Sequence, residues 1–179
     1  MTKPRATIRG LVRAGITHIV GIPDNTSGPL FTEIVRYPTI TLVSVTREGE
    51  AFAIASGLWL GGASPLVVIQ NTGLLEAGDS LRGTALRMAA PIPILITGRG
   101  YAKMERAGVT PDEPRSIGLL TRPELDSTAI LTEPTLEAWG IPFRRCAGDD
   151  DPLQAIASTI AEAHDLGRPT AVVMARGLV

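Results

Sequence analysis

Residues 41–71, TLVSVTREGEAFAIASGLWLGGASPLVVIQN, place a strand, a helix and a second strand in direct succession. The run at 65–71 has almost no polar alternation, which is typical of a strand that is buried on both faces. Residues 47–62 are mostly small or apolar and end at a Gly-Gly pair, as helices commonly do. A strand, a helix and a strand in this order predict a β-α-β unit, and therefore a parallel sheet.

The rest of the chain repeats this alternation. Further strands are predicted at 18–23, 41–45, 91–98, 142–146 and 169–176. Further helices are predicted at 4–15, 27–37, 74–89, 132–140 and 152–166. The pattern favours an α/β fold, in which a doubly wound and mainly parallel sheet has helices on both faces. A single domain is expected to span residues 1–179.

One segment, residues 99–131, shows no clear period and is expected to form a long connection. Connections longer than about 15 residues are uncommon in compact domains and often serve as lids or binding loops. A lid or binding segment and an insertion that only packs against the domain are both consistent with this sequence.

Composition argues against several classes of protein. The formal net charge is −1 and aromatic residues make up 4%, which disfavours nucleic acid or an anionic membrane as the partner. The single cysteine, Cys146, permits no intrachain disulfide, so a reducing, cytoplasmic location is expected. The N-terminal residues lack the apolar core of a signal peptide, and no apolar run has the length of a membrane span. The two histidines are far apart in sequence, so we expect no histidine-based metal site.

Polar residues gather where four of the predicted strands end. These segments are GIPDN (21–25), TREGEA (46–51), IQNTG (69–73) and ITGRGY (96–101). Each alone is ordinary turn chemistry, but the carboxyl ends of parallel strands meet at one edge of a sheet, where ligands bind. The sequence therefore predicts a site at this edge. The acidic run AGDDDP (147–152) precedes a predicted helix, so we interpret it as a helix cap rather than a metal site.

Three of these stretches carry a resemblance to a known family. GIPDN, the segment TREGEAFAIASGLWLGGASPLVVIQNTGL and the strand PIPILITGRG resemble the pyrimidine-binding (Pyr) domain of thiamine-diphosphate enzymes. The nearest resemblance is to the α subunit of sulfopyruvate decarboxylase and to the amino-terminal half of phosphonopyruvate decarboxylase. It rests mainly on Glu48, on Gly57 in the helix of small residues, and on the QNTGL sequence after the strand at 65–71.

The resemblance implies that Glu48 is catalytic and forms a hydrogen bond with N1′ of the cofactor's aminopyrimidine ring. In general, a carboxyl group held in an apolar wall has a raised pKa and can share a proton with a ring nitrogen. Asp24 is implied to be a second catalytic residue, whereas Glu50 is expected to face solvent or an interface. Besides Glu48, four residues are implied to line the cofactor cleft: Gln70, Asn71, Thr72 and Gly73. Two are candidates for contacting the substrate: Asn25 and Arg99.

The resemblance also implies a partner. The family's motif for Mg²⁺ and diphosphate, a Gly-Asp-Gly followed by a later Asn, is absent from this sequence, and we expect no metal ligands in this chain. A second subunit with that motif would bind most of the Mg²⁺, in a hetero-oligomer built on homodimeric contacts. The implied function is the pyrimidine-binding subunit of a two-subunit thiamine-diphosphate-dependent 2-oxo-acid decarboxylase. A carboligase or C–C lyase subunit and a non-catalytic, flavodoxin-like binding or regulatory domain are the alternatives.

The sequence departs from its relatives after the strand at 65–71. Glu76 and Asp79 stand where relatives have asparagines, and extra negative charge there would disfavour a substrate with a second anionic group. Five cations are candidates to offset it: Arg82, Arg87, Arg99, Lys103 and Arg106.

Overall fold

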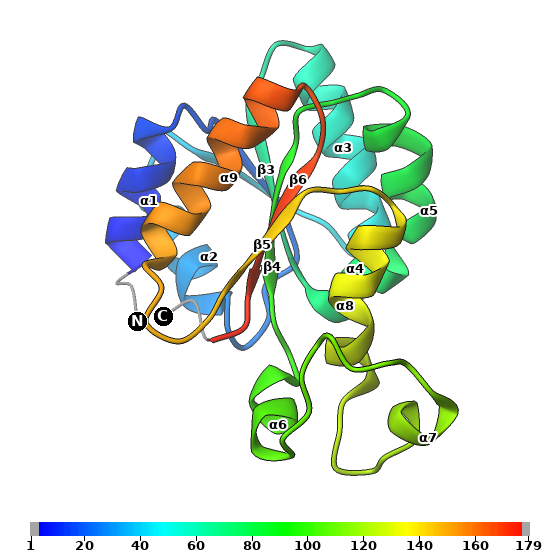
Figure 1. Cartoon of the computed structure of the whole chain (residues 1–179). Helices are drawn as coiled ribbons and strands as arrows, with labels where there is room; N and C mark the ends of the chain where they lie inside the picture. Colours follow the sequence, from blue (N-terminus) through cyan, green and yellow to red (C-terminus); the bar gives the residue numbers. More distant parts are fainter. Residues whose placement is uncertain (1–3, 177–179) are drawn as a thin grey trace.

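The computed structural model describes residues 4–176 and contains one six-stranded sheet (Figure 1). Its strands are β1 (His18–Gly21), β2 (Thr41–Ser44), β3 (Pro65–Gln70), β4 (Pro93–Thr97), β5 (Phe143–Cys146) and β6 (Thr170–Met174). The strand order is β2-β1-β3-β4-β6-β5, and every neighbouring pair is parallel. All six predicted strands are present, so the doubly wound α/β fold is confirmed.

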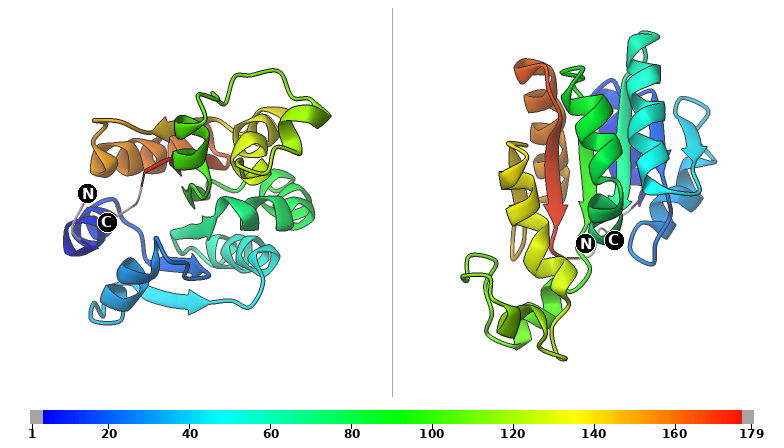
Figure 2. Two further views of the ribbon diagram at one scale, coloured as in Figure 1. Left: turned by 90° about the horizontal axis from the view of Figure 1, so that it is seen from below. Right: turned by 90° about the vertical axis from the view of Figure 1, so that its right-hand side faces the viewer.

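Helices cover both faces of this sheet. One face carries α1 (Pro4–Arg13), α2 (Gly28–Ile34) and α9 (Pro152–Leu166). The other carries α3 (Glu48–Leu60), α4 (Asn71–Glu76), α5 (Gly78–Ser80), the π-helix η1 (Leu81–Leu86) and α8 (Ser127–Ala138). Two short helices, α6 (Tyr101–Arg106) and α7 (Ile117–Leu120), lie beyond the carboxyl edge of the sheet (Figures 1 and 2). Within residues 4–176, no helix combines the length and the apolar character that crossing a membrane requires.

The central strands supply side chains to two separate cores. Successive residues of a strand point to opposite faces of the sheet. In β3, Val67 and Ile69 are buried beneath α3, whereas Leu66 and Val68 are buried beneath the helices of the opposite face. Both sets are apolar because both faces are covered, which explains why the run at 65–71 lacks polar alternation.

The prediction of a single continuous helix at 74–89 is wrong. Helical structure begins earlier, at Asn71, and is divided into α4, α5 and η1, ending at Leu86. The division between α4 and α5 falls next to Gly78, where an added Cβ would lie 3.1 Å from the ring of Trp139. Tertiary contact with α8 therefore determines where this helix breaks, and the local sequence pattern does not reveal it.

Residues 99–131 connect β4 to α8, and the segment contains two short helices, α6 and α7, and the start of α8. Tyr101, Met104 and Leu119 are buried and anchor the two short helices to the domain. Tyr101 and Met104 have helical spacing, but α6 is short and Leu119 follows much later, so the segment as a whole shows no continuous period. The helix predicted from residue 132 begins at Ser127, where the side chain of Asp126 caps it by accepting from the Thr128 backbone N–H, and Pro134 lies inside it.

Candidate active site

Residues that follow four adjacent strands share one edge of the sheet. Asp24 follows β1, Glu48 follows β2, Asn71 follows β3 and Arg99 follows β4. Hydrogen bonds join the loops: Thr97 Oγ1 donates to Asp24 Oδ2 (2.5 Å), and the Arg99 backbone N–H donates to Asn71 Oδ1 (3.1 Å). The convergence that the sequence predicts is therefore present in the structure.

Glu48 begins α3, and its side chain lies directly against Gly73 in α4. A Cβ added to Gly73 would lie 2.3 Å from Glu48 Cγ and 2.5 Å from Glu48 Oε1. Glu48 is half-buried, and among residues 4–176 its carboxylate has no hydrogen bond or ion pair. The missing side chain of Gly73 thus leaves room for a carboxylate that can bind a group from outside the chain.

Glu50, two residues later, is an exposed helix cap. Its Oε2 accepts hydrogen bonds from the backbone N–H groups of Thr46 (3.0 Å) and Arg47 (3.3 Å), and Thr46 Oγ1 donates to the same carboxylate. The backbone hydrogen bond from Thr46 is the main reason why the pKa of Glu50 is lowered. The carboxylate of Glu50 is therefore used in holding the start of α3.

Glu76 also contacts the start of α3, and it does so through Arg47. Glu76 Oε1 accepts hydrogen bonds from Arg47 Nε (3.0 Å) and Nη2 (2.6 Å), and Oε2 accepts from the Gly49 backbone N–H (2.9 Å). The hydrogen bond from Arg47 is the main cause that lowers the pKa of Glu76. Of the cations expected to offset the two extra acids, Arg82 pairs with Asp79 (2.6 Å). The partner of Glu76, Arg47, was missed, although it directly precedes Glu48 in the sequence.

Asp24 holds its own loop in place. Asp24 Oδ1 accepts hydrogen bonds from the backbone N–H groups of Thr26 (2.5 Å) and Ser27 (3.0 Å), while Oδ2 accepts from Thr97. Ser27 Oγ in turn accepts from the Asp24 backbone N–H (3.0 Å). These bonds fix the turn that leads into α2, and a catalytic role for Asp24 stays a prediction.

The residues after β3 differ in their access to the edge. Asn71 is fully buried, and its Nδ2 donates to the Arg99 carbonyl (2.9 Å) and to Thr132 Oγ1 (3.1 Å). Its amide thus braces β3, β4 and α8 against one another. Gln70 is half-buried and Thr72 is exposed, and Thr72 Oγ1 donates to Gln70 Oε1 (3.2 Å). Contact with a cofactor stays a prediction for all three residues. Gln70 and Thr72 are the better candidates for this contact, because their side chains are accessible and that of Asn71 is not.

The two candidate substrate residues follow different strands: Asn25 follows β1, and Arg99 follows β4. Asn25 is exposed in the turn after β1. Arg99 is exposed as well, and its Nε donates to Asp126 Oδ2 (2.9 Å), the residue that caps α8. Arg99 also lines a cavity of about 420 Å³ beside the start of α6. A substrate contact by either residue stays a prediction.

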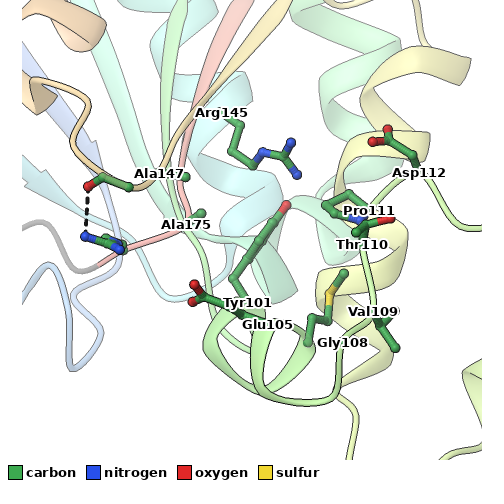
Figure 3. A pocket seen from close by; sticks show the side chains of 13 residues that line it. Tyr101, Glu105, Gly108, Val109, Thr110, Pro111, Asp112, Arg145, Ala147 and Ala175 are labelled. Carbon is green, nitrogen blue, oxygen red and sulfur yellow. Dashed lines mark hydrogen bonds between the residues drawn. The ribbon is translucent and has the colours of Figure 1, made fainter.

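A second cavity, of about 430 Å³, lies between α6 and the ends of β5 and β6, and no sequence motif indicates it (Figure 3). Tyr101 and Arg145 line it, and Figure 3 shows the Tyr101 ring between the strand ends and the loop that follows α6. The residues that line it do not include any predicted site residue.

A buried carboxyl group lies behind this cavity. Tyr101 Oη donates to Glu133 Oε1 (3.2 Å), and Arg145 Nη1 lies 3.5 Å from the same oxygen. Burial is the main cause that raises the pKa of Glu133 and of Tyr101 above their usual values. The three residues come from α8, α6 and β5, so they join the segment beyond the sheet edge to the sheet itself. No motif links them in the sequence.

The acidic run at 147–152 caps α9, as predicted. Asp151 Oδ1 accepts from the Leu153 backbone N–H (2.9 Å), and Asp150 Oδ2 accepts from the Ala147 backbone N–H (2.8 Å). Over the described range 4–176, His, Cys, Asp and Glu side chains do not gather in the groups of three that could hold a metal ion.

Together, the fold and the edge define a doubly wound α/β domain with a candidate ligand site at the carboxyl ends of its strands. Residues 1–115 match the model of the thiamine pyrophosphate enzyme family, N-terminal TPP-binding domain. The chain belongs to this family, and the resemblance inferred from the sequence is confirmed. Membership supports thiamine diphosphate as the cofactor.

Two groups of decarboxylases are similar to this chain in sequence. Phosphonopyruvate decarboxylase of Streptomyces viridochromogenes is 33% identical over 52% of this chain and 23% of the relative. Sulfopyruvate decarboxylase subunit alpha of Methanothermobacter thermautotrophicus is 30% identical over 53% of this chain and 58% of the relative. Sulfopyruvate decarboxylase of Methanosarcina acetivorans is 28% identical over 79% of this chain and 31% of the relative. The matches therefore span less than two thirds of each relative.

Solved structures share the fold. A thiamine diphosphate-dependent 4-hydroxybenzoylformate decarboxylase from Rhodococcus jostii RHA1 aligns with a TM-score of 0.65 and 17% identity, over 97% of this chain and 30% of that one. A structure described as a thiamin diphosphate-dependent enzyme from Mycobacterium smegmatis aligns with a TM-score of 0.66 and 21% identity, with the same coverage. At these identities the similarity establishes the fold alone.

Proposed function

We propose that this chain is the pyrimidine-binding subunit of a two-subunit, thiamine-diphosphate-dependent 2-oxo-acid decarboxylase, in which Glu48 activates the cofactor. The observation that carries the proposal is the carboxylate of Glu48, which lies against Gly73 and has no hydrogen bond or ion pair among residues 4–176, in a domain of the TPP-binding family. The neighbouring acids, Glu50 and Glu76, already have partners within the chain.

The residues at this edge fit an aminopyrimidine ring. Such a ring needs a carboxyl group in a partly apolar wall, and Glu48 has Gly73 beside it and the buried Ala51 and Phe52 in its own helix. Glu48 would hold a proton between its carboxylate and N1′ of the ring, while Gln70 and Thr72 would contact the ring or its substituents. When bound, the cofactor supplies the electron sink for loss of CO₂. The chain itself would orient the ring through Glu48, Gln70 and Thr72.

Two features support a second subunit. The sequence has no Gly-Asp-Gly…Asn motif for Mg²⁺ and diphosphate, and three of the relatives are named as alpha subunits. In addition, α3 presents an exposed apolar face formed by Ala53, Ile54, Gly57 and Leu60. We infer that this face packs against another subunit, because exposing it to water is costly.

The substrate class follows from the relatives and the charges at the edge. The phosphonopyruvate and sulfopyruvate decarboxylases are named for 2-oxo acids with a second anionic group. Arginine partners offset both extra acids of this chain, Glu76 and Asp79. We therefore propose a small 2-oxo acid as substrate and include 3-sulfo and 3-phosphono pyruvates among the compounds to be tested.

The test is reconstitution. The chain is mixed with a subunit that carries the Gly-Asp-Gly…Asn motif, thiamine diphosphate and Mg²⁺, and CO₂ release is measured from a panel of 2-oxo acids. We expect turnover by the complex and none by the chain alone. Product analysis separates decarboxylation from carboligation. A complex that binds no thiamine diphosphate would contradict the proposal and favour a regulatory domain.

A further inference from the structure

Arg47 lies immediately beside the proposed catalytic carboxylate. It is the N-cap residue of α3, directly before Glu48, and its side chain is 74% exposed. The pKa of Arg47 is raised mainly by its hydrogen bond to Glu76, and the charges of Glu50 and, less strongly, Glu48 act in the same direction. A guanidinium at this position can form paired hydrogen bonds with a free carboxylate.

In the structure Arg47 is held elsewhere. Both Nε and Nη2 donate to a single oxygen of Glu76, at 3.0 and 2.6 Å. Glu76 is the largest cause of the raised pKa of Arg47. The other oxygen of Glu76 accepts the Gly49 backbone N–H, so one carboxylate contacts the residues on both sides of Glu48.

We propose that Glu76 is a positioning residue that holds the Arg47 guanidinium away from Glu48 and so leaves the Glu48 carboxylate free for the cofactor. This inference rests on the proposed function of Glu48. It also gives a physical reason for an acid at position 76.

Glu50 is the other acid near Arg47, but its carboxylate already has partners, so Glu48 would be the alternative partner of the guanidinium. Glu50 accepts hydrogen bonds from Thr46 and from the Arg47 backbone N–H, and these bonds hold its carboxylate against the loop. Glu48 has no such partner among the described residues. Without Glu76, the Arg47 guanidinium could form an ion pair with the Glu48 carboxylate. This ion pair would compete with the hydrogen bond between Glu48 and the aminopyrimidine ring of the cofactor.

The experiment compares Glu76→Gln, Arg47→Gln and the double variant in the full chain. With the partner subunit, we expect Glu76→Gln to lower kcat by about tenfold, because a charge-assisted pair competes for Glu48. Arg47→Gln should change kcat by less than about threefold, since the pair itself is exposed. The double variant should recover to the level of Arg47→Gln, because the competing cation is then gone.

A second readout does not depend on turnover. In the 179-residue chain with ¹³C-labelled glutamate, the side-chain carboxyl resonance of Glu48, assigned through Glu48→Gln, should shift in Glu76→Gln and return in the double variant. A double variant as impaired as Glu76→Gln would overturn the proposal, because the carboxylate would then act through Gly49. An unchanged Glu48 resonance and kcat in Glu76→Gln would overturn it too. If the resonance moves as expected but Glu48→Gln leaves turnover intact, the proposed function fails and the positioning contact stands.

Discussion

Glu48, Glu50 and Glu76 lie within one small region, and their contacts separate their roles. Glu50 and Glu76 accept hydrogen bonds from the loop and from Arg47, so their charges stabilise the start of α3. Glu48 packs on Gly73 and keeps its carboxylate free. The sequence predicted different roles for Glu48 and Glu50, and these contacts give that difference a physical basis. The catalytic role of Glu48 stays a prediction.

At this scale we predict different outcomes for two isosteric substitutions. Glu48→Gln should lower turnover of the reconstituted complex by at least about a hundredfold, the usual scale for a positioned acid–base group. Glu50→Gln should lower turnover by less than about threefold, because an exposed acid contributes little. CO₂ release from the two variants is measured side by side. A larger loss at Glu50 would mean that the register of the catalytic glutamate is wrong.

Gly73 gives a second prediction. Gly73→Ala introduces a Cβ within 2.6 Å of three Glu48 atoms, so the Glu48 side chain must move. We expect turnover to fall by about tenfold or more, with the fold kept, because the displaced side chain can turn toward solvent. The matched control is Gly10→Ala in α1, where an added Cβ meets nothing within 4 Å and helix propensity favours alanine. Normal turnover in Gly73→Ala, measured with saturating cofactor, would argue against Glu48 as the activating group.

Among the elements, the segment between β4 and α8 is attached to the sheet by a buried carboxyl group. Glu133 is 7% exposed and contacts Tyr101 of α6 and Arg145 of β5. Burial raises the pKa of Glu133, Asp112 and Glu137 act in the same direction, and Arg145 opposes them. The folded state therefore favours the protonated form of this side chain.

The sign of the pH dependence follows. Because the pKa of Glu133 is raised on folding, its stabilising contribution is complete below the unfolded value of about 4.3 and is lost as pH rises through the higher folded value. The melting temperature of Glu133→Gln, relative to the unsubstituted chain, should therefore increase between about pH 4 and about pH 7. Glu137→Gln, an exposed change in the same helix, is the control and should show a much smaller trend. Parallel melting curves for Glu133→Gln and the unsubstituted chain would contradict the prediction.

At the scale of the whole molecule, the arrangement of the helices leaves an apolar face of α3 exposed. Leu60 is 67% exposed and Ile54 is 37% exposed, on the face of α3 that also carries Gly57. The rest of α3 is packed against the sheet and η1, so this face is available to another subunit. Glu48 shares its side of α3 with the buried Ala51 and Phe52, so an interface here would lie on the opposite side of the helix, which carries Glu50.

Leu60→Glu should therefore reduce self-association and binding of the partner subunit by at least about tenfold, because a charge in a desolvated apolar contact is costly. The fold of the chain should survive, since the side chain is exposed. Val35→Glu, at a site 76% exposed on the opposite face, is the matched control and should leave assembly unchanged. Sedimentation velocity with and without the partner measures both. If Leu60→Glu leaves assembly unchanged, the exposed face of α3 is not the subunit interface.

The sequence by itself determined the six strands, their parallel arrangement and the edge at which Asp24, Glu48, Asn71 and Arg99 meet. It could do so because strands buried on both faces leave continuous apolar runs, and parallel strands bring their carboxyl ends together. The order of polar segments along the chain was thus enough to place them at one edge.

Only the tertiary structure decided which of these side chains are free. Asn71 is occupied by Arg99 and Thr132, Glu76 by Arg47, and the helix after β3 breaks where Gly78 meets Trp139. These contacts join residues that are far apart in sequence and have no local period, so a pattern along the chain carries no record of them. The space beside Glu48 is of the same kind, because it exists through the approach of α3 to a glycine in α4.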